Sequence, residues 1–207
     1  MSTLENVFQT LEQQNWAVAD GILPDGLCQE LFSECQKSWQ SGMFQESRIG
    51  RGAEKNRRPE IRGDAIFWLD PDRDKSNAGA RFLAWTEELR QQLNERYYLG
   101  LKSAEFHFAR YPEGKGYQKH LDQHRGQTQR KISLVLYLNP SWSQQDGGEL
   151  CLYSPVQDTL EIRRVLPQAG RLVLFRSDLF PHEVLPCFQT RWSLTGWFRT
   201  DFPSVFS

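Results

Sequence analysis

Apolar side chains recur at helical spacing in two stretches of the first hundred residues. The first stretch follows a Pro-Asp helix-start signal and continues through Leu27, Leu31 and Cys35 at intervals of four residues. The second is a stripe of apolar and aromatic residues over 82–97 that stops at Gly100. Both patterns predict amphipathic helices that bury one face.

From residue 101 onward the hydrophobic period changes to two, which is the spacing of half-buried strands. Six segments separated by Pro, Gly, Asp and Asn turns show it: "AEFHFARY", "KISLVLYLN", "GELCLYS", "TLEIRRV", "RLVLFRS" and "RWSLTGWFRT". The short run "AIFWL" adds a strand before the second helix. We therefore expect a mainly β protein with flanking helices, and a double-sheet jelly roll rather than parallel βαβ units.

No repeat or linker composition divides the chain, so the prediction is a single domain over residues 1–207. Residues 1–100 should supply helical support and one mobile loop, and residues 101–207 the jelly-roll core. The loop is the polar segment between Ser47 and Arg62, which contains glycine and several arginines and lacks an apolar period. A solvated surface loop is the simplest interpretation, since a nucleic-acid site would interleave aromatic residues with the basic ones.

Overall charge and composition narrow the classes of partner. The chain has 25 Lys plus Arg and 26 Asp plus Glu, so no net field recruits nucleic acid or an anionic membrane. We find no signal-peptide pattern at the start and no apolar run long enough to span a bilayer. The four cysteines match no common zinc pattern. We expect a cytoplasmic protein with reduced thiols that binds neither nucleic acid nor membrane.

A short motif in "GYQKHLDQHRG" suggests a metal site. His120 and Asp122 are two residues apart, so in an extended strand both side chains point to the same side. A third ligand has to come from His107, His124 or His182. His182 follows an apolar strand and Pro181, and strands that wind around a barrel could return it to His120. Two imidazoles and one carboxylate would leave open positions, as in the facial triad of non-haem Fe(II) oxygenases, although H-x-D alone also fits a solvated strand end.

The other two histidines and one arginine complete the candidate chemistry. His124 is expected to lie on the surface, and His107 to be a strand histidine whose polar groups are satisfied. Arg191 opens the strand "RWSLTGWF", whose alternation places Ser193, Thr195 and Trp197 on its side. A buried guanidinium needs a carboxylate partner, so Arg191 could anchor an anionic co-substrate; the alternative is a surface arginine at a strand end.

Several separated motifs occur in an order that resembles a known family. They are "IRGDAIFWL", "RYPEGKGYQKHLD", "LYLN" and "FPHEVLP" followed by "TRWSLTGWF". Over residues 61–198 the chain resembles the 2-oxoglutarate- and Fe(II)-dependent dioxygenases, which fold as a double-stranded β-helix. Within that family it is similar to the prolyl hydroxylase branch, which includes the animal hypoxia-inducible-factor prolyl hydroxylases and their bacterial counterparts.

The resemblance implies roles for individual residues. His120, Asp122 and His182 would be the iron ligands. The residues implied in co-substrate binding are Arg191, which would bind the distal carboxylate of 2-oxoglutarate, and Tyr137, Tyr111 and Trp197. Trp197 is equally well explained as core filling. The loop before "IRGD" would fold over a protein substrate, with Arg62 and Asp64 as substrate-binding residues.

The implied activity is protein prolyl 4-hydroxylation coupled to oxidative decarboxylation of 2-oxoglutarate. It would use Fe(II), 2-oxoglutarate and O2, with ascorbate as a supporting reductant. The implied partner is a protein that carries the target proline, with elongation factor Tu as the candidate if the chain is bacterial. Two alternatives stay open: a dioxygenase of the same fold acting on a free amino acid or an alkylated base, and a non-catalytic jelly-roll module that binds metal.

Overall fold

Two antiparallel sheets and three helices make up the part of the chain that the structure describes. This computed structural model describes residues 3–47, 58, 60–70, 72, 77–123 and 128–202. The helices are α1 (Leu4–Gln14), α2 (Leu27–Gln40) and α3 (Ala78–Tyr97), with a short 3₁₀ turn, η2 (Gln144–Asp146). The strands are β1 (Trp16–Asp20), β2 (Gln45–Glu46), β3 (Ala65–Trp68), β4 (Ser103–Tyr111), β5 (Tyr117–His120), β6 (Arg130–Tyr137), β7 (Leu150–Tyr153), β8 (Glu161–Val165), β9 (Arg171–Arg176), β10 (His182–Val184) and β11 (Arg191–Arg199).

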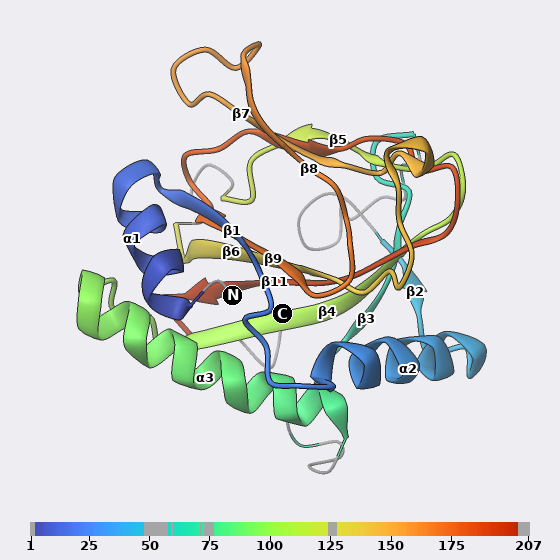
Figure 1. Cartoon of the computed structure of the whole chain (residues 1–207), viewed down its shortest axis with the longest axis horizontal. Coiled ribbons are helices and arrows are strands. Elements are labelled where there is room, and N and C mark those ends of the chain that lie inside the picture. Colours follow the sequence, from blue (N-terminus) through green and yellow to red (C-terminus); the bar gives the residue numbers. More distant parts are fainter. Residues whose placement is uncertain are drawn as a thin grey trace.

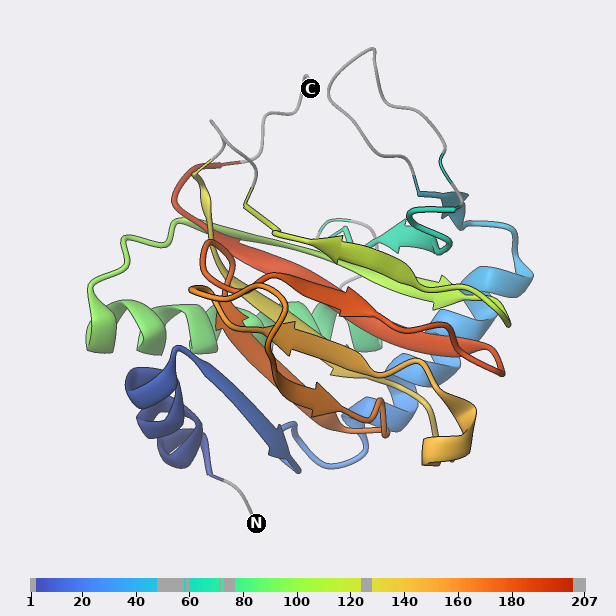
Figure 2. The same ribbon diagram turned by 90° about the horizontal axis from the view of Figure 1, so that it is seen from above.

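The sheets form the two walls of a jelly roll. The large sheet has the order β1-β9-β6-β11-β4-β3-β2, and the small one β5-β10-β7-β8. Figure 1 shows the three helices on one side of the large sheet and β5, β7 and β8 on the other. Figure 2 shows the small sheet in front, with its four strands in that order. The expected mainly β, double-stranded β-helix fold with flanking helices is confirmed.

Strand alternation separates the interior into two cores. Even-numbered residues of the central strands, such as Phe106, Leu134 and Leu194, pack against the helices. Odd-numbered residues, such as Val135 and Phe175, face the small sheet. Because successive side chains of a strand point to opposite faces, one period-two pattern supplies both layers. The polar residues of the candidate site all belong to the second, inter-sheet layer.

The amino-terminal segment differs from expectation. Helix α1, which buries Val7, Phe8 and Leu11, and strand β1, which pairs with β9, were not predicted. The Thr3 side chain caps α1 by accepting a hydrogen bond from the Asn6 N–H. Strands β1, β2 and β3 all belong to the large sheet. The first hundred residues therefore contribute three strands as well as helices.

The two predicted helices are confirmed, with different ends. Helix α2 begins at Leu27, after Gly26 in a left-handed conformation (φ 75°). Helix α3 ends at Tyr97, before Gly100, because Tyr98 adopts the left-handed conformation (φ 53°) and donates its N–H to the Asn94 carbonyl.

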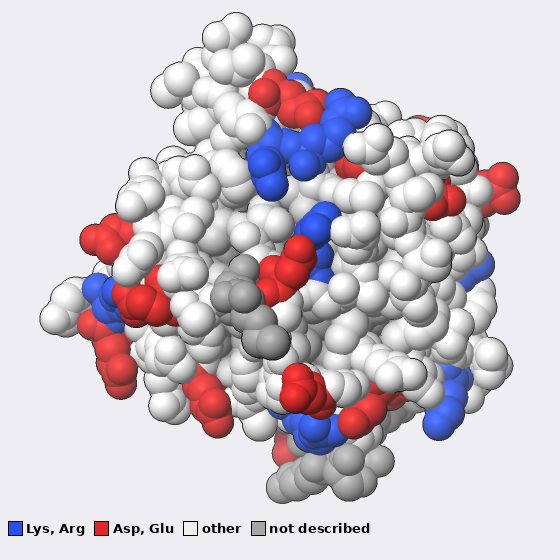
Figure 3. Space-filling view, viewed as in Figure 1, with Lys and Arg blue, Asp and Glu red and all other residues white. Residues whose placement is uncertain are grey.

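Two features of the surface bear on possible partners. Among the described residues, no helix combines the length and apolar character needed to cross a bilayer. On the face shown in Figure 3, acidic and basic side chains are intermingled. Near the β7–β8 hairpin, for example, Arg164 pairs with Glu161 at 2.8 Å.

Candidate metal centre and co-substrate site

Strand pairing in the small sheet brings the two candidate histidine ligands together. His120 is the last residue of β5 and His182 the first residue of β10, and the two are paired in antiparallel register. Asp122 follows two residues after His120 and turns into the same space. The potential ligand atoms of the three residues lie within 4.8 Å of one another. The structure thus brings together the His-Asp-His set that the sequence suggested.

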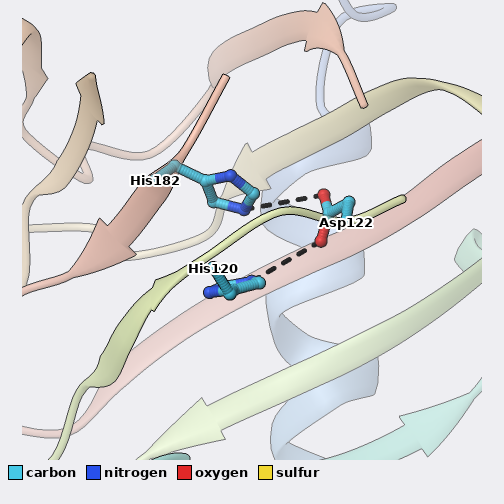
Figure 4. Close-up of side chains that lie close together, drawn as sticks. All are labelled: His120, Asp122 and His182. Carbon is cyan, nitrogen blue, oxygen red and sulfur yellow. Dashed lines mark ion pairs between the residues drawn. The ribbon is translucent and has the colours of Figure 1, made fainter. Parts of the chain in front are cut away.

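Hydrogen bonds fix the tautomer of both imidazoles. The Nδ1 atom of His120 lies 2.8 Å from the Gln118 carbonyl, and that of His182 lies 3.0 Å from the Phe180 carbonyl. Because a carbonyl only accepts, each Nδ1 carries the hydrogen and each Nε2 keeps its lone pair. Those Nε2 atoms face Asp122, 3.5 Å from Oδ1 for His120 and 3.6 Å from Oδ2 for His182 (Figure 4). This is the tautomer that binds a metal through Nε2.

The protonation states also suit a metal. Burial alone would raise the pKa of Asp122, but His182, His120 and a hydrogen bond from Ser133 hold it well below its usual value. Ser133 Oγ donates to Oδ2 at 2.6 Å and contacts Ser177 Oγ at 2.9 Å. Burial lowers the pKa of His182 to about 4, so at neutral pH its imidazole is uncharged. One carboxylate and two imidazoles with free Nε2 lone pairs form a donor set that fits Fe(II).

A second buried group lies on the same inner face of the jelly roll. Arg191 is 1% exposed. Its Nε donates to the Gly148 carbonyl at 2.8 Å and its Nη1 to Ser193 Oγ at 3.3 Å. Its guanidinium lies 5.1 Å from the centres of both the Tyr111 and Tyr137 rings. No described carboxylate forms an ion pair with it. A buried cation without an anion is unfavourable, so the site is suited to a ligand that brings a carboxylate.

The Tyr137 hydroxyl strengthens this interpretation. It is fully buried and has no hydrogen-bond partner among the described residues. Burial, opposed by the charge of Arg191, raises the pKa of Tyr137 to about 12, so the hydroxyl remains protonated and can donate. Tyr111 is the register partner of Arg191 on β4, and burial raises its pKa as well. Arg191 and Tyr137 therefore present donors suited to a carboxylate.

Comparisons with known proteins agree with this geometry. Residues 106–199 match the model of the 2OG-Fe(II) oxygenase superfamily. The crystal structure of a Pseudomonas putida prolyl-4-hydroxylase superposes with a TM-score of 0.82 at 39% identity, covering 96% of this chain and 100% of that one. The chain belongs to the 2OG-Fe(II) oxygenase superfamily. It falls in the prolyl hydroxylase branch, and the cofactors of this oxygenase are Fe(II), with 2-oxoglutarate and O2 as co-substrates.

Two further relatives lie in the same branch. A Trichoplax adhaerens prolyl hydroxylase, solved with a hypoxia inducible factor peptide fragment, has a TM-score of 0.79 at 29% identity, covering 94% of this oxygenase and 87% of that chain. The Caenorhabditis elegans hypoxia-inducible factor prolyl hydroxylase is 31% identical over 204 residues, which is 94% of this chain. The match spans only 28% of the C. elegans protein.

The remaining candidate residues of the oxygenase contact other side chains of the described chain. Trp197 stacks beside His107 (ring centres 5.6 Å apart) and beneath the Arg130 guanidinium (3.5 Å). Arg62 and Asp64 bind each other. His124 lies outside the described residues, as does most of the arginine-rich loop.

Sequence reasoning missed three residues that support the site. Ser133 donates to the Asp122 carboxylate, Ser177 contacts Ser133, and the Gly148 carbonyl accepts from Arg191. The two serines could have been found from the sequence. Each is a polar residue at an inward-facing position within or directly after an otherwise apolar strand. Gly148 carried none, since its contact is made by a backbone carbonyl.

His107 lies in a strand as predicted, but the expectation that its polar groups are satisfied is wrong for Nδ1. That atom is buried and has no hydrogen-bond partner among the described residues. The ring packs instead between Trp68 and Trp197, with centres 4.7 Å and 5.6 Å away. An unpaired buried nitrogen is destabilising.

His107→Leu is expected to raise the free energy of unfolding, and to do so more in acid. Burial, reinforced by Arg62, lowers the pKa of His107 from 6.5 to about 3. Below the ordinary pKa of histidine, His107 therefore takes up a proton in the unfolded chain but not in the folded protein. The free energy of unfolding consequently decreases as the pH is lowered. Leucine does not titrate, so its advantage should grow by about 2 kcal/mol between pH 8 and pH 5 in urea denaturation. A difference between the two proteins that is independent of pH would contradict this account.

Proposed function

We propose that this oxygenase hydroxylates prolyl residues of a protein substrate, at the 4-position of the ring, and consumes 2-oxoglutarate and O2. The observation that carries the proposal is that the His-Asp-His cluster lies on the same inner face of the jelly roll as a buried arginine with no anionic partner among the described residues. The likeness to the P. putida prolyl-4-hydroxylase, which covers the whole of that chain, supports proline as the target.

Each residue would have a distinct part in the reaction. His120, Asp122 and His182 would hold Fe(II), which when bound supplies the O2 activation that couples decarboxylation of 2-oxoglutarate to C–H hydroxylation. Arg191 and Tyr137 would bind the distal carboxylate of 2-oxoglutarate, with Tyr111 closing one side of the guanidinium. The Nδ1 hydrogen bonds and Ser133 would keep the three ligands oriented, and the apolar inter-sheet layer would exclude water.

Trp197 would shield the site where the substrate side chain approaches the metal ligands. Its inner-face position opposite Ser133, the partner of Asp122, supports this part of the proposal. Arg62 and Asp64 were expected to bind the substrate. They would instead act on the metal ligand His120 through Tyr117. Ascorbate would support turnover as a reductant. The protein would act in the cytoplasm, where it would meet its protein substrate.

The proposal is tested by incubating the purified protein with Fe(II), 2-oxoglutarate, O2 and ascorbate. The first candidate substrate is elongation factor Tu, because the sequence resembles bacterial prolyl hydroxylases, and a cell lysate is the second. We expect a one-oxygen gain on a prolyl residue by mass spectrometry, together with one succinate per hydroxylation. Asp122→Ala is the matched inactive control. Oxygen gain on residues other than proline, or on free amino acids only, would reject the assignment.

A further inference from the structure

Asp64 is a buried carboxylate whose hydrogen-bonding capacity is largely occupied by its own chain. Its Oδ1 accepts from Ser47 Oγ and Arg62 Nε, both at 2.7 Å, and its Oδ2 accepts from Arg62 Nη2 at 3.0 Å. The Ser47 N–H also donates to the Asp64 carbonyl at 3.1 Å. Burial would raise the pKa of Asp64, but Arg62 and Ser47 outweigh it and lower the pKa, so the carboxylate is ionised. We call Ser47, Arg62 and Asp64 the clasp.

The clasp reaches the metal ligand His120 through one aromatic ring. The Arg62 guanidinium lies 5.0 Å from the centre of the Tyr117 ring. The Tyr117 ring also stacks nearly parallel to the His120 imidazole, with ring centres 3.6 Å apart and an interplanar angle of 19°. Asp64, Arg62, Tyr117 and His120 thus form a continuous series of contacts.

Backbone pairing follows the same route. The Gly63 N–H donates to the Gly116 carbonyl at 3.1 Å, and the Gln118 N–H donates to the Ile61 carbonyl at 2.8 Å. Gln118 is also the residue whose carbonyl accepts from His120 Nδ1. The segment that carries the clasp therefore also supports the carbonyl that sets the tautomer of this ligand.

His120 needs this support more than the other histidine does. The His182 side chain is 6% exposed and packs edge-on against Phe175, whereas that of His120 is 16% exposed. A partly exposed side chain at a strand end keeps its rotamer only where neighbours restrict it. The Tyr117 ring lies closer to His120 than the His182 ring does (centres 3.6 Å against 4.3 Å apart), and Arg62 contacts Tyr117 in turn.

We propose that Asp64 and Arg62 are positioning residues for the metal centre, which orient His120 through Tyr117 rather than binding substrate. The inference rests on the proposed function only in that His120 ligates Fe(II). It assigns no contact between Asp64 and the polypeptide, because both carboxylate oxygens already accept hydrogen bonds within the clasp. Loss of the clasp should therefore weaken metal binding before any substrate is present.

The test is an anaerobic titration of the full-length protein with Fe(II), without substrate, followed by 2-oxoglutarate to read the visible charge-transfer band. Asp64→Asn is expected to weaken Fe(II) binding by about 10- to 100-fold, the usual loss when the support of a metal-ligating histidine is removed. Asp20→Asn is the control for loss of an Asp–Arg pair elsewhere, since Asp20, whose side chain is 62% exposed, forms a two-bond pair with Arg171 (2.9 Å each) at the edge of the large sheet. It should bind Fe(II) as the wild type does.

Substitutions of Tyr117 separate positioning from general stability. Tyr117→Leu removes the stacked ring and should weaken Fe(II) binding as Asp64→Asn does, whereas Tyr117→Phe keeps the ring and should restore near-normal binding. The double variant Asp64→Asn/Tyr117→Leu should lose little more than either single variant, because the two act in one series. The comparison of Tyr117→Leu with Tyr117→Phe stays informative even if Asp64→Asn folds poorly.

Two results would overturn the proposal. One is wild-type Fe(II) affinity in Tyr117→Leu or in folded Asp64→Asn. The other is an effect of Asp64→Asn confined to the KM for the polypeptide, which would mark Asp64 as a substrate contact. Failure of the proposed function looks different: the wild type would bind Fe(II) and 2-oxoglutarate, and the variants would show the losses described, but no prolyl residue would gain oxygen.

Discussion

Asp122→Ala should abolish Fe(II) binding at micromolar concentrations, and with it all turnover. Asp122 is the one carboxylate of the cluster and lies between the two Nε2 atoms, so its loss leaves only the two imidazoles as ligands. Loss of a supporting group already costs 10- to 100-fold in metal affinity, and loss of a ligand should cost at least about 100-fold. The measurement is anaerobic titration with Fe(II) in the presence of 2-oxoglutarate, which should give a visible charge-transfer band in the wild type alone.

Ser133→Ala provides a graded companion to this variant. It removes the hydroxyl that donates to Asp122 Oδ2 at 2.6 Å but leaves all three ligands, so we expect about a tenfold weaker Fe(II) affinity. Asp20→Ala, at the exposed edge of the large sheet, is the control for loss of a carboxylate elsewhere. An undiminished band in Asp122→Ala would refute the assignment of the metal centre.

Arg191→Met should cause the second large loss, in affinity for 2-oxoglutarate rather than for Fe(II). Removing one partner of a buried, hydrogen-bonded charge pair costs about 2–5 kcal/mol, which is about a 30- to 4,000-fold rise in the dissociation constant. Arg191→Lys should be intermediate, because an ammonium keeps the charge but not the planar fork. Titration of the Fe(II)-loaded protein with 2-oxoglutarate under anaerobic conditions measures both.

The same substitution should have the opposite effect on the ligand-free protein. Arg191 is buried with no described anionic partner, so replacing it with methionine should raise the melting temperature in the absence of co-substrate. Arg176→Met is the control, since Arg176 pairs with Asp178 at the surface. Unchanged affinity for 2-oxoglutarate in Arg191→Met would show that the co-substrate carboxylate binds elsewhere.

Local patterns in the sequence predicted much of the fold. The period of two in the carboxy-terminal half and the helical stripes at 27–35 and 82–97 depend only on which side chains face the core. These elements are present in the structure. Helix α1 carried a usable signal that was missed, because Leu4, Val7, Phe8 and Leu11 are spaced as on one face of a helix. Strand β1 escaped prediction because its identity depends on β9, more than 150 residues away in the sequence.

The sequence by itself determined which chemical groups are present: an H-x-D pair, a later histidine and an arginine at the start of a strand. Their order resembles that of the 2-oxoglutarate- and Fe(II)-dependent dioxygenases. Only the tertiary structure decided which groups meet. It joined His120 to His182 by strand pairing, Ser133 to Ser177 across 44 residues, and Ser47 to Asp64 across 17. It also left His107 Nδ1 without a described partner and turned Arg62 and Asp64 toward each other. The reason is physical, because residue type determines what a side chain can bind, whereas its partner is determined by the strand register and packing that bring distant segments together.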